Sequence, residues 1–415
     1  METDTKTLFT LGLGLTEPWV VRDTKLMVSE PDAKHKELHI WIDFNRDHLF
    51  LSSKGQLLKA YDSVEKTWRH LNFFEHPCYL HANVPRLKTT CSTIEMVPVP
   101  WARSGSGFTL LFEAFALALI EETPVNSVAE VMQETAPRIW RVFSHWVGIG
   151  KNRIDLSCVT RVGVDETSSK KGHRYITQFV DLDTHKTIFV CEGKDACTFR
   201  KFLAWFEEHG GFAGQITLVA MDMSAAFLSG CMACFPKAQI VYDKFHIIQE
   251  ANKALDEVRK MEKGEKKLLK GQRYTLLHLR KNLPDSKLST LDTILYTYPD
   301  LGAAYSLREG LVDALSPKSS DPEQGWNAFS KWLDLAEKSG LPPLDRFVKT
   351  LKAHLFGIKA FFECGRVTNS VLEGLNSKIQ LAKRRARGFR NVENFINMIY
   401  FLNGGNVFRF SHETL

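Results

Sequence analysis

One short stretch decides the fold of this chain: Arg161-Val162-Gly163-Val164-Asp165-Glu166-Thr167. A similar stretch covers residues 216–224 and ends in Asp222-Met223-Ser224. Both are apolar, rich in β-branched residues and bounded by polar turns, a pattern typical of buried strands. Because sites form where the strands of an α/β sheet end, we expect Asp165 and Asp222 at one edge of a sheet, as a candidate catalytic pair.

The segments around these two strands alternate between strand and helix patterns. Residues 175–180 and 187–190 are strand-like, residues 195–209 have a helical period, and a strand at 239–242 leads into a long helix. This order predicts a mixed α/β sheet. Two polar residues at the start of that helix form either part of an active site or a buried, hydrogen-bonded pair: Asp243 and His246.

A third acid lies on a predicted amphipathic helix that begins near residue 370. Glu373, Asn376 and Gln380 share its polar side, and cations without an intervening acid follow. A carboxylate beside a basic strip suits a divalent cation and phosphate oxygens, whereas a solvated face or a nuclear-localisation-like patch is the simpler alternative. The candidate DNA-binding residues of this strip are Lys378, Lys383, Arg384, Arg385, Arg387 and Arg390.

Four motifs in this order resemble the signatures of the ISL-three family of bacterial insertion-sequence transposases. They are Val164-Asp165-Glu166-Thr167, Met221-Asp222-Met223-Ser224, Asp243-Lys244-Phe245-His246 and Glu373-Gly374-Leu375-Asn376, with Lys383-Arg384-Arg385 behind the last. The resemblance covers most of the chain. It implies a ribonuclease-H-like fold and a catalytic and metal-binding triad of the two-Asp-plus-Glu (DDE) type: Asp165, Asp222 and Glu373. It also implies an active-site neighbourhood of Asp243, His246 and Asn376.

Phosphodiester cleavage and strand transfer are in-line displacements at phosphorus, which two divalent ions about 3.5 to 4 Å apart can promote. Hard oxygen ligands favour Mg²⁺, with Mn²⁺ as a substitute. We therefore expect Asp165 to bridge two ions, while Asp222 and Glu373 hold one each. The resulting prediction is a transposase that binds the terminal inverted repeats of its insertion sequence and cuts and joins DNA.

The N-terminal part, residues 1–100, predicts an arm up to about residue 34 and a small β-rich module. The related transposases typically carry a zinc-binding module here with two Cys-x-x-Cys pairs, but this chain keeps only Cys91 of the second pair. Structural zinc requires four ligands, so we expect a module without bound zinc. The alternative is an improvised site of His76, Cys78, His81 and Cys91.

Residues 101–150 predict a helix-turn-helix DNA-binding domain. Helical patterns cover 108–122 and 137–147, and Ser127 with Glu130 forms a capping-box pattern for a helix between them. An ordinary three-helix connector is the alternative. The candidate DNA contacts on the last helix are Arg138 and Arg141. Cations in the turn after the first core strand either hold a DNA backbone or form a solvated hairpin: Lys170, Lys171 and Arg174.

The remaining boundaries follow from the placement of the triad. They are the first part of the catalytic core at 151–255, an all-helical insertion at 256–365, the final Glu-bearing helix at 366–403 and a tail at 404–415.

Composition agrees with a DNA-binding protein. The 415 residues carry a net charge of +6, and the eight Cys do not form a disulfide framework. No membrane span or signal peptide is recognisable, so we expect a cytoplasmic, nucleoid-associated protein. The expected partner is double-stranded DNA, both inverted repeats and target, bound by a homo-oligomer of at least two chains. A transposase-derived DNA-binding protein without catalysis and another ribonuclease-H-like DNA nuclease are the alternatives.

Overall fold

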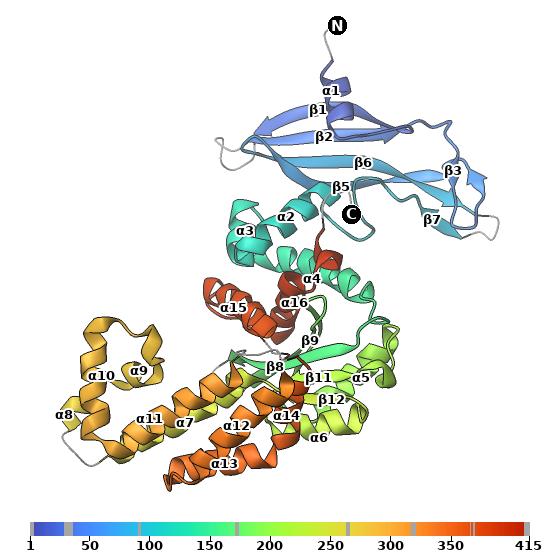
Figure 1. The fold of residues 1–415 in the computed structure, drawn as a ribbon. Coiled ribbons are helices and arrows are strands. Elements are labelled where there is room, and N and C mark those ends of the chain that lie inside the picture. The colour runs from blue at the N-terminus through green and yellow to red at the C-terminus, as the bar shows by residue number, and fades with distance from the viewer. Residues whose placement is uncertain are drawn as a thin grey trace. The chain divides into compact units, whose positions relative to one another are not determined.

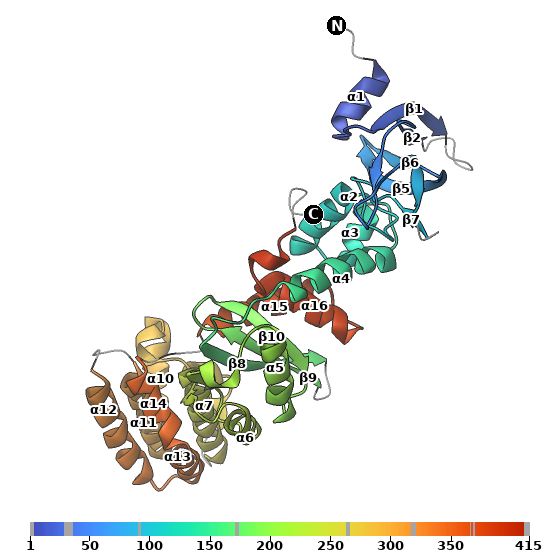
Figure 2. The same ribbon diagram turned by 90° about the vertical axis from the view of Figure 1, so that its right-hand side faces the viewer.

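The chain forms two compact units in this computed structural model, which describes residues 4–28, 36–89, 93–170, 174–262, 266–316, 321–365, 367 and 370–410. Unit 1 comprises Met1–Lys151, Ala382–Arg387 and Asn406–Leu415, and unit 2 comprises Asn152–Leu381 and Gly388–Gly405. Figures 1 and 2 show the elements of each unit in two views. Within the described ranges, no helix combines the length and the hydropathy that crossing a bilayer requires.

Unit 1 begins with a twisted sheet in the order β1-β2-β6-β5, with β7 paired to β6 (Figure 1). Strands β2 and β6 run parallel, and the other pairs are antiparallel. Alternate residues face a core in which Trp101 packs edge-on against Trp19 and Trp68. The bounds are α1 (Thr5–Gly12), β1 (Trp19–Val28), β2 (Lys36–Phe44), β3 (Phe50–Leu51), β4 (Leu57–Leu58), β5 (Asp62–Phe73), β6 (His76–Lys88) and β7 (Ile94–Met96).

The prediction of an N-terminal arm up to residue 34 is wrong for the part of it that the structure describes. Helix α1 and strand β1 are ordered there, and Trp19 and Val21 are buried. Strand β1 pairs along most of its length with β2, from Trp19 opposite Phe44 to Val28 opposite Lys36. A strand that lies at the edge of a sheet draws its stability from that partner, so its own sequence pattern is weak.

The described members of the alternative zinc set do not converge. Cys78 lies on the core face of β6, where burial raises the pKa of its thiol to about 12. His81 lies on the opposite face, where its Nε2 is 2.8 Å from Nδ1 of His39. Residues an odd number apart on a strand point to opposite faces, which separates these two side chains. Cys91 lies outside the described residues.

We expect unit 1 to lose stability on acidification because of His81. Burial lowers the pKa of this imidazole, and the nearby His39 acts in the same direction. The native state then binds fewer protons than the unfolded state as the pH falls below about 6.5, so the free energy of unfolding falls by up to about 1.4 kcal/mol per pH unit. Urea titrations of wild type and His81→Gln at pH 7.5 and 5.5 measure this slope, which the variant should reduce. An unchanged slope would contradict the assignment, and the exposed His185 provides a control as His185→Asn.

Three helices follow the sheet within unit 1: α2 (Leu110–Glu122), α3 (Val125–Val131) and α4 (Ala136–Asn152). Thr109 caps α2 by accepting a hydrogen bond from the amide of Phe112. The predicted cap at Ser127 is wrong, because α3 begins two residues earlier, directly after Pro124. Proline lacks an amide hydrogen and fixes its φ, so it commonly stands at a helix start.

The end of the chain also belongs to unit 1 in its described part. The predicted tail from residue 404 is wrong up to residue 410, since Phe408 and Phe410 are buried. The ring of Phe408 lies so close to Gly150 of α4 that an added Cβ would approach it to 2.6 Å. A glycine at this point of α4 makes the close approach possible.

Unit 2 contains a five-stranded sheet in the order β10-β9-β8-β11-β12. Strand β9 runs antiparallel to both β8 and β10, whereas β11 runs parallel to both β8 and β12. This is the mixed α/β sheet that the sequence predicts. The bounds are β8 (Arg161–Lys170), β9 (Arg174–Asp181), β10 (Lys186–Glu192), α5 (Cys197–Glu208), β11 (Leu218–Met221), α6 (Ala225–Cys234) and β12 (Gln239–Tyr242).

Beyond β12, the described part of unit 2 is helical (Figure 2). Helix α14 packs along β12, where Gly357 lies against the ring of Tyr242. The single final helix predicted for 366–403 is two helices in the described residues from 370 onward, because Arg387 and Gly388 have φ values of +53° and +92° and end the first. The helices are α7 (Lys244–Met261), α8 (Lys266–Leu269), α9 (Arg273–Leu277), α10 (Asp285–Thr297), α11 (Pro299–Leu315), α12 (Pro322–Glu337), α13 (Pro342–Ala353), α14 (Leu355–Glu363), α15 (Ser370–Arg385) and α16 (Val392–Asn403).

Candidate active site

Two of the predicted acids lie at one edge of the sheet in unit 2. Asp222 directly follows β11, and Asp165 lies beside it on β8, five residues before that strand ends and not at its last position as predicted. Ala220 of β11 is paired with Gly163 of β8, so two residues further along Asp222 is level with Asp165. The next strand, β12, ends at Tyr242 opposite Met221, and Asp243 follows at the same edge. The parallel registers of β8, β11 and β12 bring these three residues level with one another, although they are far apart in the sequence.

Asp165 receives donors from three parts of the chain. The side-chain amide of Asn376 in α15 donates to its Oδ2 at 2.6 Å, and the backbone amide of Glu166 donates to its Oδ1 at 2.7 Å. His246, in the first turn of α7, places Nε2 3.8 Å from Oδ1. The Asp165 side chain is only 18% exposed, so these donors hold a carboxylate that is largely shielded from water.

Burial sets the protonation of the surrounding groups. It raises the pKa of Asp222, an effect that the nearby His246 partly offsets. Burial also raises the pKa of Glu166, against the opposing charge of Lys194. The carboxylate of Asp165 in turn raises the pKa of His246 and favours the imidazolium form. Keeping several carboxylates ionised away from water costs free energy unless positive charge lies beside them.

Glu373 lies on the helix that touches Asp165, but its own side chain is exposed. Helix α15 contacts β8 twice, through Asn376 to Asp165 and through Gln380 to Thr167 at 2.8 Å. Glu373 stands one turn before Asn376 on the same side of the helix. With the described residues it forms no hydrogen bond or ion pair, and these residues contain no group of three acids, histidines or cysteines that could hold a metal ion.

Asp243 caps α7, accepting a hydrogen bond from the amide of Phe245 at 3.3 Å, and its side chain is buried. Ser224 likewise caps α6, as its place two residues after Asp222 indicates. Asp243 is therefore next to the acids and supports the helix that carries His246.

The cations predicted to contact DNA differ in their surroundings. Arg138 is ion-paired with Glu134 at 2.6 Å and stacks over the ring of Phe108, whereas Arg141 on the same helix is exposed. Arg385 pairs with Glu122 at 2.8 Å. The strip on and after α15 otherwise has Lys378, Arg384, Arg387 and Arg390 exposed and Lys383 half-buried. The predicted contacts at Lys170, Lys171 and Arg174 lie outside the side chains that the structure describes.

Sequence reasoning missed two residues at this edge, Lys194 and Gln380. Lys194 follows β10, a strand that ends at the same edge as β8, and its charge offsets part of the burial-driven rise in the pKa values of Asp222 and Glu166. The available signal was a lysine shortly after a predicted strand. Gln380 had a signal too, its spacing of seven residues from Glu373 along one side of the helix.

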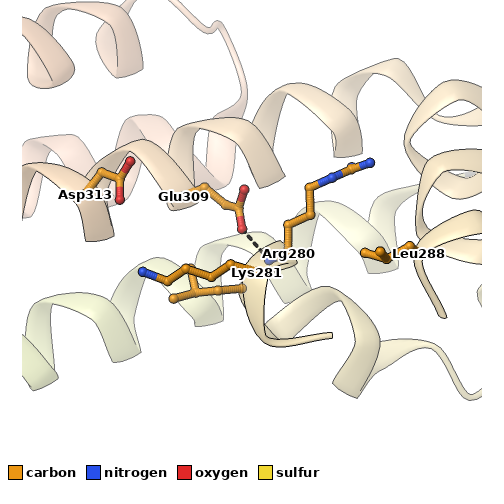
Figure 3. Close-up of a pocket in the computed structure, with 6 residues that line it drawn as sticks. Arg280, Lys281, Leu288, Glu309 and Asp313 are labelled. Carbon is orange, nitrogen blue, oxygen red and sulfur yellow. Dashed lines mark hydrogen bonds between the residues drawn. The ribbon is translucent and has the colours of Figure 1, made fainter. Parts of the chain in front are cut away.

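A pocket of about 440 Å³ lies elsewhere, among η2 (Arg280–Asn282), α10 and α11. Figure 3 shows the Glu309 carboxylate turned toward the Arg280 backbone, whose amide donates to it at 2.6 Å, while the Arg280 guanidinium points away. Arg280 is instead paired with Asp292 at 2.7 Å. The charged groups that line the pocket are thus largely engaged in other contacts. The pocket shares no residue with the acidic edge, which is the edge of the sheet that carries Asp165 and Asp222.

The residues at the acidic edge fit a divalent cation. Asp165 and Asp222 supply hard carboxylate oxygens from adjacent strands. The raised pKa of Asp222 reflects the cost of its buried negative charge, which a bound cation would relieve. These two side chains would hold it.

Comparisons with known proteins identify the family of the chain. A model described as the helix-turn-helix domain of transposase family ISL3 matches residues 97–147, and a DDE-type transposase model of that family matches residues 162–399. The transposase for insertion sequence element IS1001 of Bordetella parapertussis is 28% identical over 362 residues, which cover 84% of this chain and 87% of that protein. The transposase for element IS1557 of Mycobacterium tuberculosis is 28% identical over 361 residues, 80% of either chain. A match across more than half of its length places the chain in the ISL3 family of DDE-type transposases.

Proposed function

We propose that the chain binds the terminal inverted repeats of its own insertion sequence and cleaves and joins DNA strands with Asp165, Asp222 and Glu373. The observation that carries the proposal is the hydrogen bond between Asn376 and Asp165, because it anchors the helix that bears Glu373 beside the two aspartates. In this proposal the exposed carboxylate of Glu373 turns toward the pair.

A ribonuclease-H-like core is part of this proposal. Three consecutive antiparallel strands followed by two parallel ones, with one acid on the first strand and another directly after the fourth, support it. The helices between β12 and α15 then form an insertion before the helix of the third acid. The domain boundaries at residues 150, 255 and 365 belong to the same proposal.

Each residue of the edge has a part in the reaction. Asp165 and Asp222 hold the cations, with Glu373 as a further oxygen ligand, and Asn376 fixes the orientation of the Asp165 carboxylate. His246 offsets the negative charge of the aspartates. Mg²⁺ held by these residues would supply the Lewis-acid chemistry that activates an attacking oxygen and stabilises a leaving oxygen.

DNA recognition falls to other elements. The helix-turn-helix of α2 to α4 reads the element's ends, with the exposed Arg141 on its last helix. The cations on and after α15 contact phosphates, which supply most of the affinity for DNA. Two ends must be brought together for transposition, so the active assembly contains at least two copies of the chain on the bacterial chromosome.

We expect cleavage to require a divalent cation that DNA binding does not need. A duplex carrying the element's terminal inverted repeat should be bound but left uncut in chelator, and cut once Mg²⁺ or Mn²⁺ is added. Mg²⁺ should also raise the unfolding temperature of wild type, since a ligand that binds only the folded state stabilises it. It should not do so for the double variant Asp165→Asn/Asp222→Asn. Cutting in the presence of chelator would refute the proposal.

A further inference from the structure

Phe245 is an exposed aromatic residue beside the candidate catalytic acids. It stands in the first turn of α7, between the buried cap residue Asp243 and His246, which contacts Asp165. Its side chain is 44% exposed, although the preceding strand β12 is buried apart from its first residue. Only its backbone amide is used by the cap, so the ring has no part in starting the helix.

Two lysines flank the acids at this edge. The Nζ atom of Lys244 lies 5.9 Å from the centroid of the Phe245 ring. On the other side, Lys194 is exposed in the loop after β10, with its Nζ 4.0 Å from the ring centroid of Tyr175. Tyr175 is itself paired with Ser168 of β8, three residues beyond Asp165, which keeps Lys194 close to the acids.

This arrangement suits an unpaired DNA strand. A nucleobase presents an apolar face that stacks on an aromatic ring, and this contact is available only when the base has left the duplex. Lysines beside such a ring supply charge for the phosphates. The shielded carboxylate of Asp165 also favours a single strand, because the scissile phosphate must reach a group that is only 18% exposed.

We propose that the strand being cut crosses this edge unpaired, with a base next to the scissile phosphate stacked on Phe245 and a backbone phosphate held by Lys194. The inference rests on the proposed function and adds to it the state of the substrate. Phe245 is a positioning residue in this scheme. It takes no part in the chemistry, and it fixes where the phosphate lies over Asp165 and Asp222.

The test removes the ring and the base separately and together. The full-length chain cleaves end duplexes in Mg²⁺, with or without an abasic nucleotide at each of the positions flanking the cut. We expect Phe245→Ala to slow cleavage of the intact duplex about 10-fold, the scale of losing one base stack. An abasic nucleotide at the stacked position should slow cleavage by wild type to a similar degree. It should not slow Phe245→Ala further, because the variant and the abasic nucleotide remove the same contact.

Other variants separate stacking from folding. Phe245→Leu keeps the apolar volume and should be as slow as Phe245→Ala, whereas Phe245→Trp should restore the rate. Phe212 is a matched control, since it is 60% exposed and precedes β11, at the opposite end of the strands. Phe212→Ala should cleave as wild type does. Lys194→Ala should weaken binding to the element's end. The slope of log affinity against log salt concentration should fall by about one, the contribution of a single phosphate contact.

Two results would overturn the inference: a rate for Phe245→Ala equal to that of Phe212→Ala, or abasic effects of the same size in wild type and Phe245→Ala at every position. The proposed function fails differently, through a wild-type protein that leaves intact end duplexes uncut in Mg²⁺.

Discussion

We expect Asp165→Asn, Asp222→Asn and Glu373→Gln each to abolish DNA cleavage by this transposase and to leave binding to the element's ends intact. Each change removes one negative charge and keeps the shape of the side chain, so a cation at the edge loses an oxygen ligand. We expect a loss of about 10³-fold or more, at the upper end of what removing one electrostatic stabiliser from a reacting site costs. Cleavage of labelled end duplexes and a parallel gel-shift titration measure the two quantities.

Asp222→Asn carries a second expectation. Burial raises the pKa of Asp222, so at neutral pH without a cation its charge destabilises the fold. The neutral amide should therefore raise the unfolding temperature in chelator while it eliminates cleavage. Asp183→Asn is the control, because Asp183 follows β9 and pairs with Arg161 at the other end of the strands. Full cleavage by any of the three variants would remove that residue from the site.

The second large effect concerns Glu113 in α2. This carboxylate is fully buried and accepts hydrogen bonds from Arg103 at 2.9 Å, Ser106 at 2.6 Å and Trp146 at 2.7 Å. It thereby connects α2 to α4 and to the segment before α2. Glu113→Ala leaves those donors without a partner, and we expect it to lower the free energy of unfolding by about 3 kcal/mol.

Because Glu113 joins helices of the helix-turn-helix domain, the same variant should lose end binding. Urea unfolding followed by tryptophan fluorescence, together with a gel shift, tests both effects. Glu113→Gln keeps the volume and part of the hydrogen bonding, so its loss should be smaller. Glu121→Ala changes an exposed acid of the same helix and should leave both properties unchanged. Equal stability of Glu113→Ala and Glu121→Ala would contradict this account.

The secondary structure of the core could be predicted because its signals are local. The five strands of the mixed sheet lie where short β-branched runs stand in the sequence, and the helix expected at 195–209 is α5 (Cys197–Glu208). The two errors near the ends of the chain have a common cause. β1, Phe408 and Phe410 are ordered by contacts with distant parts of the chain, and such contacts leave little trace in the local pattern.

The candidate site divides in a similar way. Asp165, Asp222 and Glu373 could be singled out by motif and position, whereas Lys194 was missed because its place at the acidic edge depends on how β10 joins the sheet. Arg138 was selected for its charge and lies in an ion pair with Glu134, so its surroundings show a contact that its position in the sequence does not.

The sequence alone determined the strands of the mixed sheet and the family motifs, because periodicity and residue type act over a few positions. Only the tertiary structure decided that Asn376 binds Asp165 across 211 residues of chain, that His246 joins them, and that Phe245 remains exposed beside them. The physical reason is that these placements follow from strand pairing and helix packing. Such interactions depend on which surfaces meet, and no local stretch of the chain contains that information.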